Sequence, residues 1–327
     1  MELTEEQSMA MDFIGEQTNR CTRDGKNDEW KDNIVKNREA FSKGNPTLAG
    51  IVTYVVCAGP GLVKNAHELK NISHRGIIVC VDAALRYLVK CGITPEYCIM
   101  IDASDKIMTM TEGVDTSNIT LICTPSANPK VIDYWKGPKF FVSTPYVNVD
   151  RKYNMRHLTR IVKAKCDIKE GDELMLDEQY EVSFEGIHDV ILCGGNVSTA
   201  AHHFAAVHLK SQKIVFVGLD LSWEFDNHHY AGAEHQENYR DRTKTGVGTA
   251  KDLNGKEVST NLSLLSFKRW HEAIAKQPPR DVVNATEGGI LGVEQDGSRV
   301  DYMDFMTLAE AIEKFTPLPS ANGKESK

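Results

Sequence analysis

The stretch IVTYVVCAGPGL at residues 51–62 decides the fold class of this 327-residue chain. Its first seven residues form a nearly continuous apolar and β-branched run, as in a strand that is buried on both faces. A glycine-rich turn follows, and a helix can begin directly behind it. A strand that leads through such a turn into a helix is typical of open α/β sheets, which bind ligands at the carboxyl ends of their strands.

The same unit recurs along the chain. Further apolar runs predict buried strands at residues 76–82, 97–102, 119–123, 139–143, 190–195 and 213–221. Helical segments separate several of them, and ALRYLVKCG at 84–92 is the clearest, with Gly92 well placed to end it in a left-handed conformation. Strands that alternate with helices predict a doubly wound, mostly parallel sheet with right-handed crossovers.

Both ends of the chain differ from this pattern. Residues 1–48 carry Trp30, Ile34 and Phe41 at helical spacing and predict a helical N-terminal arm. Residues 49–315 form the predicted α/β domain. Residues 316–327 are short of apolar side chains and predict a disordered tail.

Two long polar stretches interrupt the predicted domain. Residues 144–189 and 222–262 lack strand or helix periodicity, and we interpret them as lid or insert loops, since long loops in compact domains are usually functional. The first stretch holds a local basic cluster at 151–165, for which we expect an anionic partner in the donor or the acceptor.

The composition restricts the class of protein. Apolar residues make up 41% and charged residues 26%, as in a water-soluble globular enzyme. No stretch approaches the ~20 apolar residues of a membrane-spanning helix, and the N-terminus has no export signal. We therefore expect no membrane partner. The formal net charge of −8 argues against tight, sequence-independent binding of a polyanion.

The eight cysteines contain no C-x-x-C pair, which excludes zinc ribbons and thioredoxin-like redox sites. Five of them fall inside apolar runs, where a thiol behaves as a small hydrophobic group: Cys57, Cys80, Cys98, Cys123 and Cys193. This placement predicts reduced core cysteines and hence a cytoplasmic protein.

The turn at Gly59, Pro60 and Gly61 is the first candidate site. A strand that ends in such a turn aims backbone N–H groups at one point, which suits a phosphate. The sequence is neither G-x-G-x-x-G nor a Walker A loop. A tight strand-to-helix turn that needs glycine for steric reasons is the alternative.

Carboxylates at strand ends form the second candidate site. Asp82 and Asp102 each end a predicted strand, and Asp105 follows Asp102 by one turn. Asp102 could accept hydrogen bonds from a ribose or from an incoming hydroxyl, or it could hold Mg²⁺ together with Asp105. A simple helix N-cap remains the alternative for each of them.

The third candidate is the start of an Ala-rich helix. Gly194 and Gly195 end the predicted strand at 190–195, and Asn196 and Ser198 are residues that commonly cap helices. The first turn of this helix could hold an anion or a base. A capped helix without any ligand explains the same residues.

The fourth candidate is the loop after Asp220, which ends the strand at 213–221 on the expected ligand side of the sheet. His228 and His229 lie beside acidic residues in this loop, and histidines suit acid–base chemistry near neutral pH. With His235 they could form a metal site, although their spacing matches no standard zinc pattern. A polar surface loop is the alternative.

These pieces occur in the order of a known family. The chain resembles the MptE-like domain of Maf (motility-associated factor) proteins over residues 51–292. The resemblance rests on G-P-x-L at 59–62, ITPEYCIMIDA at 93–103, the region 194–220, and R-x-V-V-N-A-T-E-G-G at 280–289. The family is similar in fold to bacterial sialyltransferases, so a Rossmann-like, sialyltransferase-like fold is implied. Gly61 stands where the family's phosphate turn has a serine.

The resemblance implies two chemistries. Maf proteins transfer a nonulosonic sugar to flagellin hydroxyls, and archaeal MptE proteins move diphosphate from ATP to 6-hydroxymethyl-dihydropterin with Mg²⁺. We expect a glycosyltransferase with a CMP-linked nonulosonic acid donor, no cofactor, and a hydroxyl acceptor in a protein, a glycan or a modified base. A homo-oligomer stays open. The alternatives are the ATP- and Mg²⁺-dependent diphosphokinase and a non-catalytic nucleotide-binding module.

The glycosyltransferase interpretation gives each candidate a role. The turn at 59–61 approaches the donor phosphate, Asp82 and Asp102 contact ribose or sugar, and Asn196 and Ser198 bind the donor at the helix start. A histidine of the pair 228–229 donates a proton to the departing phosphate, and we favour His229 because it directly precedes Y-A-G. In the diphosphokinase interpretation, Asp102 and Asp105 hold Mg²⁺.

Overall fold

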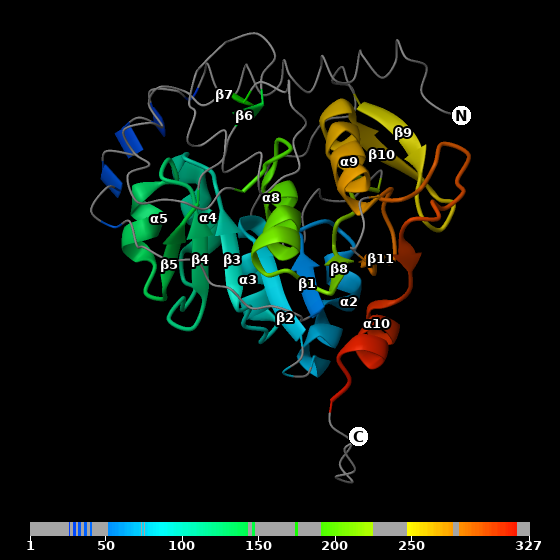
Figure 1. The fold of residues 1–327 in the computed structure, drawn as a ribbon, viewed down its shortest axis with the longest axis horizontal. Helices are drawn as coiled ribbons and strands as arrows, with labels where there is room; N and C mark the ends of the chain where they lie inside the picture. The colour runs from blue at the N-terminus through cyan, green and yellow to red at the C-terminus, as the bar shows by residue number, and fades with distance from the viewer. Residues whose placement is uncertain are drawn as a thin grey trace.

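The apolar runs form an eight-stranded sheet in which every strand pair is parallel, in the order β12-β11-β8-β1-β2-β3-β4-β5 (Figure 1). The strands are β1 (Val52–Val56), β2 (Gly76–Val81), β3 (Tyr97–Met100), β4 (Thr120–Cys123), β5 (Lys139–Phe141), β8 (Lys213–Val217), β11 (Asp281–Asn284) and β12 (Asp304–Phe305). The predicted doubly wound α/β architecture is therefore confirmed.

The computed structural model describes residues 52–72, 74, 76–142, 146–147, 174–175, 191–224, 247–276 and 281–318, with residues 26, 29–30, 32–33, 36–37 and 40 near the N-terminus. The predicted basic segment at 151–165, Ile34, Phe41, and the histidines at 228, 229 and 235 lie outside these residues.

The centre of the sheet is a topological switch point. β1 pairs with β2 on one side and with β8 on the other, in a register that aligns Val55 with Val79 and with Phe216. β2 to β5 extend away from β1 in one direction, while β8, β11 and β12 extend in the other. The loops after β1 and β8 therefore diverge, and such a point is where open α/β sheets form a ligand crevice.

Helices flank the sheet. They are α2 (Leu62–Asn65) with η2 (Ala66–Asn71), α3 (Asp82–Lys90), η3 (Asp105–Ile107) with α4 (Met108–Thr111), α5 (Pro129–Tyr134), α8 (Val197–His203) with a π turn (Phe204–His208), α9 (Leu262–Ala275) and α10 (Leu308–Phe315). α8 packs on β1, β2 and β3 and lies across the near face of the sheet in Figure 1. The right-handed crossovers place α2 and α3 on the other face.

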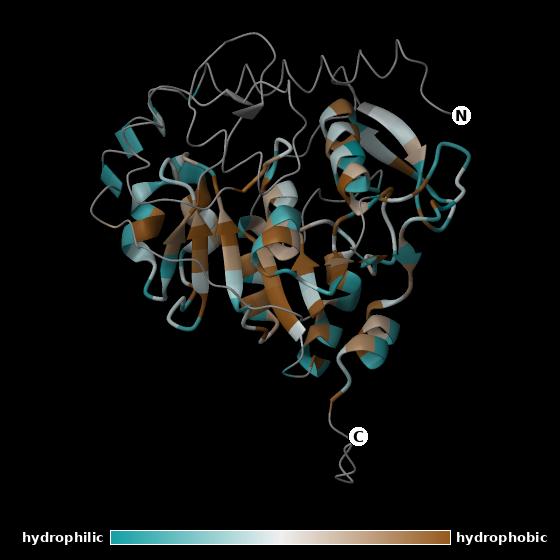
Figure 2. Ribbon diagram, viewed as in Figure 1, coloured by the Kyte–Doolittle hydropathy of each residue, from teal (hydrophilic) through white to brown (hydrophobic). Residues whose placement is uncertain are grey.

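Burial follows this layering. The strands of the central sheet are coloured as hydrophobic in Figure 2, while the helices carry hydrophilic residues on their outer turns. α3 buries Ala84, Leu85 and Leu88. Gly92 follows the end of this helix, and its φ of 75° is the left-handed conformation expected there. The five cysteines predicted to be reduced are free thiols; four of them are buried and Cys193 is half-buried. Within the described residues, no helix has the length and apolar character that crossing a membrane requires.

One predicted strand is wrong. Residues 191–196 are irregular rather than extended. The chain instead passes from this segment directly into α8, and β1 pairs with β2 and β8. Local bonds replace a ladder: the N–H of Gly194 donates to Oγ1 of Thr199 at 2.8 Å, and the Cys193 thiol donates to the carbonyl of Asn196 at 3.2 Å.

The loop predicted at 222–262 is also wrong in its second half. β9 (Val247–Lys251) and β10 (Glu257–Asn261) form an antiparallel hairpin, and Trp223 pairs with Ser259 beside it. Within the loop predicted at 144–189, β6 (Tyr146–Val147) pairs with β7 (Leu174–Met175). These strands are too short or too polar to stand out in the sequence.

The ends of the chain agree in part with expectation. The described residues between Lys26 and Asn37 are helical, as predicted for the N-terminal arm. The tail prediction fails at Thr316, which is fully buried and shares a 2.6 Å hydrogen bond with the hydroxyl of Tyr54. Tyr54 thereby ties the end of α10 to the central strand.

Candidate active site

The carboxyl ends of the parallel strands form one side of the sheet, which we call the ligand edge. Its described parts are the segments that follow β1, β2, β3, β4, β8 and β11, together with the start of α8 (Figure 1). The structure therefore brings most of the predicted site residues to the same edge, although they come from segments up to about 160 residues apart.

The glycine turn after β1 holds a carboxylate of the protein itself. The N–H of Gly61 donates to Oδ1 and Oδ2 of Asp220 at 3.0 and 3.1 Å, and the N–H of Gly59 donates to the carbonyl of Gly218 at 2.8 Å. A Cβ on Gly59 would overlap the Asp220 carboxylate. The glycines are thus required by the close approach of Asp220, and Pro60 lies between them, partly exposed.

Asp220 is an unusual carboxyl group. Its side chain is buried, and burial raises its pKa to about 7, although the Gly61 N–H and the charge of Lys64 act in the opposite direction. The backbone after it is strained, since Leu221 has a φ of 54°. Gly289 packs against the Asp220 backbone, and the N–H of Ile290 donates to its carbonyl at 2.8 Å.

The segment at 284–289, one of the most specific pieces of the resemblance, is scaffolding for this switch point. Asn284 accepts from the N–H of Thr286 at 2.9 Å, and Thr286 accepts from the N–H of Leu219 at 3.1 Å. The Glu287 carboxylate accepts from the Asn65 amide at 2.9 Å and from the N–H of Leu308, the first residue of α10, at 3.0 Å. These bonds fix the loop after β11 against α2 and α10.

The strand-end carboxylates Asp82 and Asp102 interact electrostatically across the ends of β2 and β3. Asp82 is buried at the start of α3 and accepts from the N–H of Ala83 at 2.6 Å. Burial, with a smaller effect from the charge of Asp102, raises the pKa of Asp82 to about 7. A carboxyl group of this kind exchanges its proton near neutral pH.

Asp102 has the opposite environment. Its Oδ1 accepts from the N–H of Ser104 at 2.9 Å and from the ammonium of Lys26 at 3.0 Å. Burial alone would raise the pKa of Asp102, but Ser104 and Lys26 outweigh burial and lower it. The side chain is 41% exposed, so Asp102 is an accessible, ionised acceptor.

Asp105 and Asp102 have different hydrogen-bond partners. Its carboxylate pairs with the ammonium of Lys130 at 2.6 Å and with the amide of Asn128 at 2.9 Å, and these groups lower its pKa. Within the described part of the chain, no three His, Cys, Asp or Glu side chains are grouped so as to hold a metal ion. Asp102 and Asp105 are each paired with a lysine of their own, so the described arrangement does not join them around a shared Mg²⁺ ion.

The N-terminal helix, by which we mean the described helical residues between Lys26 and Asn37, lies over this part of the ligand edge. The Asn33 amide donates to the carbonyls of Ala103 and Ser126, both at 3.2 Å. The Asn37 amide donates to the carbonyls of Pro125 and Ala127 at 2.9 and 2.8 Å. Figure 1 shows described pieces of this helix, in dark blue, beside α5. No sequence pattern predicted that Lys26, Asn33 and Asn37 reach the site.

Asn196 caps α8 as predicted. Its Oδ1 accepts from the N–H of Thr199 at 3.1 Å and from the hydroxyl of Ser198 at 2.8 Å. Gly194 packs directly on the ring of Trp270 in α9, and Gly195 has a φ of 105°, which explains both glycines. These residues border the ligand edge but have internal roles as well.

Ser198 leads into a buried polar chain that the sequence did not reveal. Its Oγ lies 3.0 Å from Nε2 of His271, and Nδ1 of His271 lies 3.1 Å from Nδ1 of His202. Burial lowers the pKa of His271 to about 3, so this ring is neutral. Since 73 residues separate Ser198 from His271, no local motif could signal the contact.

After β8 the structure describes the chain as far as Glu224, which precedes His228 and His229. Trp223 is held by two backbone hydrogen bonds to Ser259 of β10, at 2.9 and 2.8 Å, and Glu224 pairs with Lys256 at 3.0 Å. Both histidines lie outside the described residues, so their role stays a prediction.

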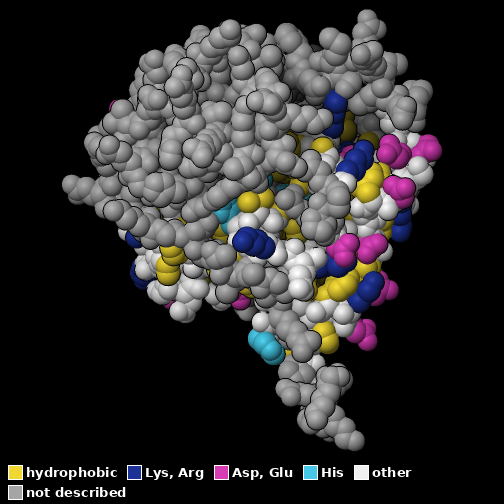
Figure 3. Space-filling model, viewed as in Figure 1, with side chains coloured by type: hydrophobic (Ala, Val, Ile, Leu, Met, Phe, Trp, Pro, Cys, Tyr) yellow, Lys and Arg dark blue, Asp and Glu magenta, His cyan; other side chains and the backbone are white. Residues whose placement is uncertain are grey.

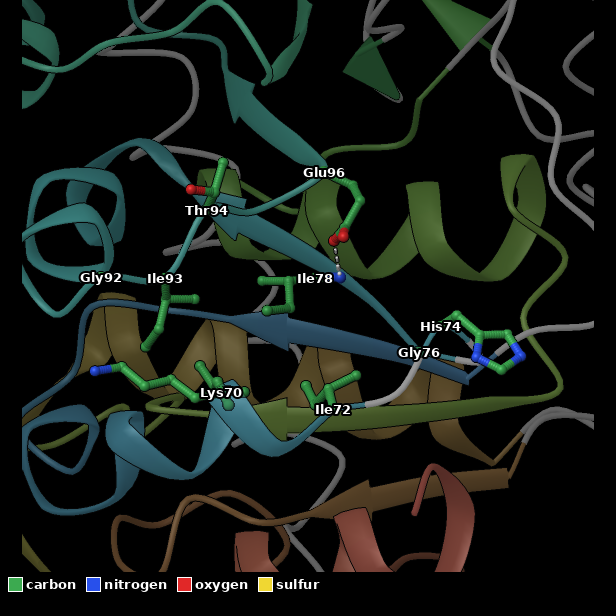
Figure 4. A pocket seen from close by; sticks show the side chains of 10 residues that line it. Lys70, Ile72, His74, Gly76, Ile78, Gly92, Ile93, Thr94 and Glu96 are labelled. Carbon is green, nitrogen blue, oxygen red and sulfur yellow. Dashed lines mark hydrogen bonds between the residues drawn. The ribbon is translucent and has the colours of Figure 1, made fainter. Parts of the chain in front are cut away.

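A groove of about 500 Å³ lies at the opposite, amino end of β2 and β3 (Figure 4). Glu96 and Lys70 line it, and the Glu96 carboxylate accepts from the N–H of Ile78 at 2.7 Å. Because this groove lies away from the strand ends that gather Asp82, Asp102 and Asp220, we do not assign the reaction to it.

The visible described surface carries mixed charge. Basic and acidic side chains are interspersed on the face shown in Figure 3, and neither sign forms a broad patch there. The described side chains visible in this view form no basic stripe of the kind that binds a polyanion.

Comparisons with known proteins agree with this geometry. The solved structure of a MAf glycosyltransferase from Magnetospirillum magneticum AMB-1 is similar to the chain, with a TM-score of 0.51 and 14% identity. The likeness covers 87% of this chain and 38% of that chain, so the present chain spans well under half of that protein, and at this identity it shows the fold. A search of curated proteins finds no match.

The sequence profile described as "6-hydroxymethylpterin diphosphokinase MptE-like" matches residues 28–226, which is more than half of the chain. The matched region contains the glycine turn, both strand-end carboxylates, the start of α8 and Asp220. The chain belongs to the MptE-like family.

Proposed function

We propose that the protein transfers a sugar from a nucleotide-activated donor, a CMP-linked nonulosonic acid, to a hydroxyl acceptor at the ligand edge. The carboxylate pair at the ends of β2 and β3 carries this proposal, because Asp82 binds a proton near neutral pH while Asp102 stays ionised. Neighbouring carboxylates with separated pKa values commonly divide acid–base and binding roles. Membership of the MptE-like family and the MAf-like fold support a transferase.

In the proposed reaction, the acceptor oxygen forms a bond to the anomeric carbon while the bond from that carbon to the donor phosphate oxygen breaks. The phosphate leaves with the electron pair. Asp82 takes the proton of the acceptor hydroxyl. Because the pKa of Asp82 is about 7, about half of the Asp82 side chains are ionised at pH 7, which suits a general base. Asp102 accepts hydrogen bonds from hydroxyls of the ribose or the sugar.

The nucleotide is proposed to lie between the turn at Gly59, Pro60 and Gly61 and the start of α8 at 194–198. Asp220 keeps the turn in shape through the N–H of Gly61. His229, or His228 in its place, is the proposed acid that protonates the departing phosphate. A proton donor at that oxygen stabilises the charge that develops in the transition state.

The first test is a thermal-shift panel with CMP, CDP, UDP, GDP, and ATP with Mg²⁺. A ligand at about 100 times its dissociation constant stabilises the folded state by about 2.7 kcal/mol, which is readily measured. We expect a response to CMP that EDTA does not abolish. A response to none of the nucleotides would favour a module without a working site.

The second test addresses the base. Asp82→Asn should lower kcat for release of CMP from the donor by ~10²–10⁴, with little change in CMP affinity. Asp115→Asn is the matched control, since Asp115 is an exposed aspartate that binds only the nearby Ser117. Turnover of the Asp82 variant at the parent rate would show that the base lies elsewhere.

A pterin diphosphokinase is the second candidate, because the matched profile carries that description. It predicts a thermal shift with ATP only when Mg²⁺ is present, and phosphate transfer to a hydroxymethylpterin. Since the described Asp102 and Asp105 do not assemble a magnesium site, we derive no step through the metal.

A further inference from the structure

The N-terminal helix brings a cation to the ligand edge from outside the sheet. Lys26 precedes the matched family region at 28–226, and its ammonium lies 3.0 Å from Oδ1 of Asp102. Neither the family match nor the structural likeness assigns it a role. The pair is partly exposed, with 34% of the Lys26 side chain and 41% of the Asp102 side chain accessible, and such pairs contribute little to folding stability. The contact therefore calls for an explanation other than stability.

The position of Lys26 is fixed by its own helix. Asn33 and Asn37 are 5% and 2% exposed, and their amides satisfy four backbone carbonyls in the loops after β3 and β4. Trp30 is also buried, at 7%. Removing these amides would leave buried carbonyls without donors, which is costly. The helix is therefore anchored to the same loop that carries Asp102.

We infer that Lys26 is a positioning residue of the transferase site, which orients Asp102 so that Asp102 can accept hydrogen bonds from the hydroxyls of the donor's ribose or sugar. This inference rests on the proposed function. With Oδ1 engaged by Lys26 and Ser104 and the side chain partly exposed, Oδ2 can accept from a ligand hydroxyl. Among the described residues, Lys26 and Asp82 are the charged groups that interact with Asp102.

Lys26 is one of the groups that lower the pKa of Asp102, so losing Lys26 should raise that pKa. Removal of a lysine that had no effect on the site would leave the titration of Asp102 unchanged.

The chain offers a matched control for this lysine. Lys130 pairs with Asp105 at 2.6 Å near the same edge, and its side chain is more exposed, at 63%. Lys130→Met removes an equivalent lysine–aspartate pair without touching Asp102. Lys26→Arg keeps the charge and tests rescue.

The experiment compares the parent, Lys26→Met, Lys26→Arg and Lys130→Met by two readouts. The first is the titration of Asp102, followed by NMR of ¹³C-labelled aspartate carboxyl groups; we expect Asp102 to titrate at higher pH in Lys26→Met only. The second is calorimetric binding of CMP; we expect about a tenfold weaker Kd in Lys26→Met, a change within about threefold in Lys26→Arg, and no change in Lys130→Met.

An unchanged Asp102 titration or an unchanged Kd in Lys26→Met would overturn the inference, as would an equal effect of Lys130→Met. The proposed function fails in a different way, namely when the parent releases no nucleotide from any CMP-linked donor. The titration arm needs no substrate, so the two failures are distinguishable. Coincident thermal unfolding of all four proteins confirms that the variants fold.

Discussion

Replacing Asp220 by Asn should remove a pH-dependent loss of stability. The buried Asp220 has a pKa of about 7 in the folded protein, against 3.8 for the ordinary group. The folded state therefore keeps a proton that the unfolded chain has already released. Its stabilising effect is fully present below about pH 4 and is lost as the pH rises towards 7.

The difference between the two pKa values sets the magnitude. At 1.36 kcal/mol for each pH unit, the rise from 3.8 to about 7 corresponds to about 4 kcal/mol in total. About 2–3 kcal/mol of this falls between pH 5 and pH 8, where the unfolded chain is already ionised. An asparagine has nearly the same shape, can still accept from the N–H of Gly61, and does not titrate.

Urea unfolding at pH 5 and pH 8 measures the effect. The free energy of unfolding should fall between these pH values by about 2–3 kcal/mol less in Asp220→Asn than in the parent. Asp82 titrates in both proteins and cancels in the comparison. Asp301→Asn, at an exposed position, is the control and should follow the parent. Parallel pH curves for Asp220→Asn and the parent would refute the reasoning, because Asp220 would then be ionised in the fold at no cost.

Three further predictions concern the scaffold. In Gly61→Ala the new Cβ would lie 2.8 Å from Oδ1 of Asp220, so we expect a loss of about 1–3 kcal/mol in urea unfolding; parent-like stability would mean that the turn can shift. Thr307→Ala removes the capping box of α10 and should cost about 1 kcal/mol, seen as a lower Tm, whereas an unchanged Tm would show that other contacts hold the helix start. His271→Leu leaves Ser198 without its imidazole partner and should destabilise by about 1–3 kcal/mol at pH 8. The loss should be about 2 kcal/mol smaller at pH 5, because only the parent pays there for keeping neutral a ring that is protonated in the unfolded chain; an equal loss at both pH values would contradict the lowered pKa of His271.

The sheet and its ligand edge could be predicted because their signals are local. Continuous apolar runs mark buried strands, and parallel strands bring all their carboxyl ends to one side, so Asp82, Asp102 and Asp220 had to gather there. The strand predicted at 190–195 failed because apolar composition does not distinguish a strand from an irregular segment that is held by local hydrogen bonds. The hairpin of β9 and β10 was missed because its strands are polar and partly exposed.

The partners of the site residues could not be predicted, because each contact joins distant parts of the chain. Gly61 looked like a phosphate ligand, and only the fold shows that a carboxylate 159 residues away occupies its N–H. Lys26 and Asp102 are 76 residues apart and share no pattern. Sequence reasoning places a residue at an edge, but it does not reveal which neighbour sets its charge.

The buried chain from His202 to Asn196 has a fixed direction of proton donation. The only hydroxyl proton of Ser198 is given to Oδ1 of Asn196, so Nε2 of the neutral His271 must carry the proton that faces Ser198. Nδ1 of His271 is then bare, and Nδ1 of His202 must donate to it. Both oxygen lone pairs of the Asn196 amide are engaged, by Ser198 and by Thr199, which leaves its NH₂ group to meet any outside partner. The orientation of this amide and the tautomers in the core are thus coupled, and the Asn196 side chain can offer a bound molecule hydrogen-bond donors.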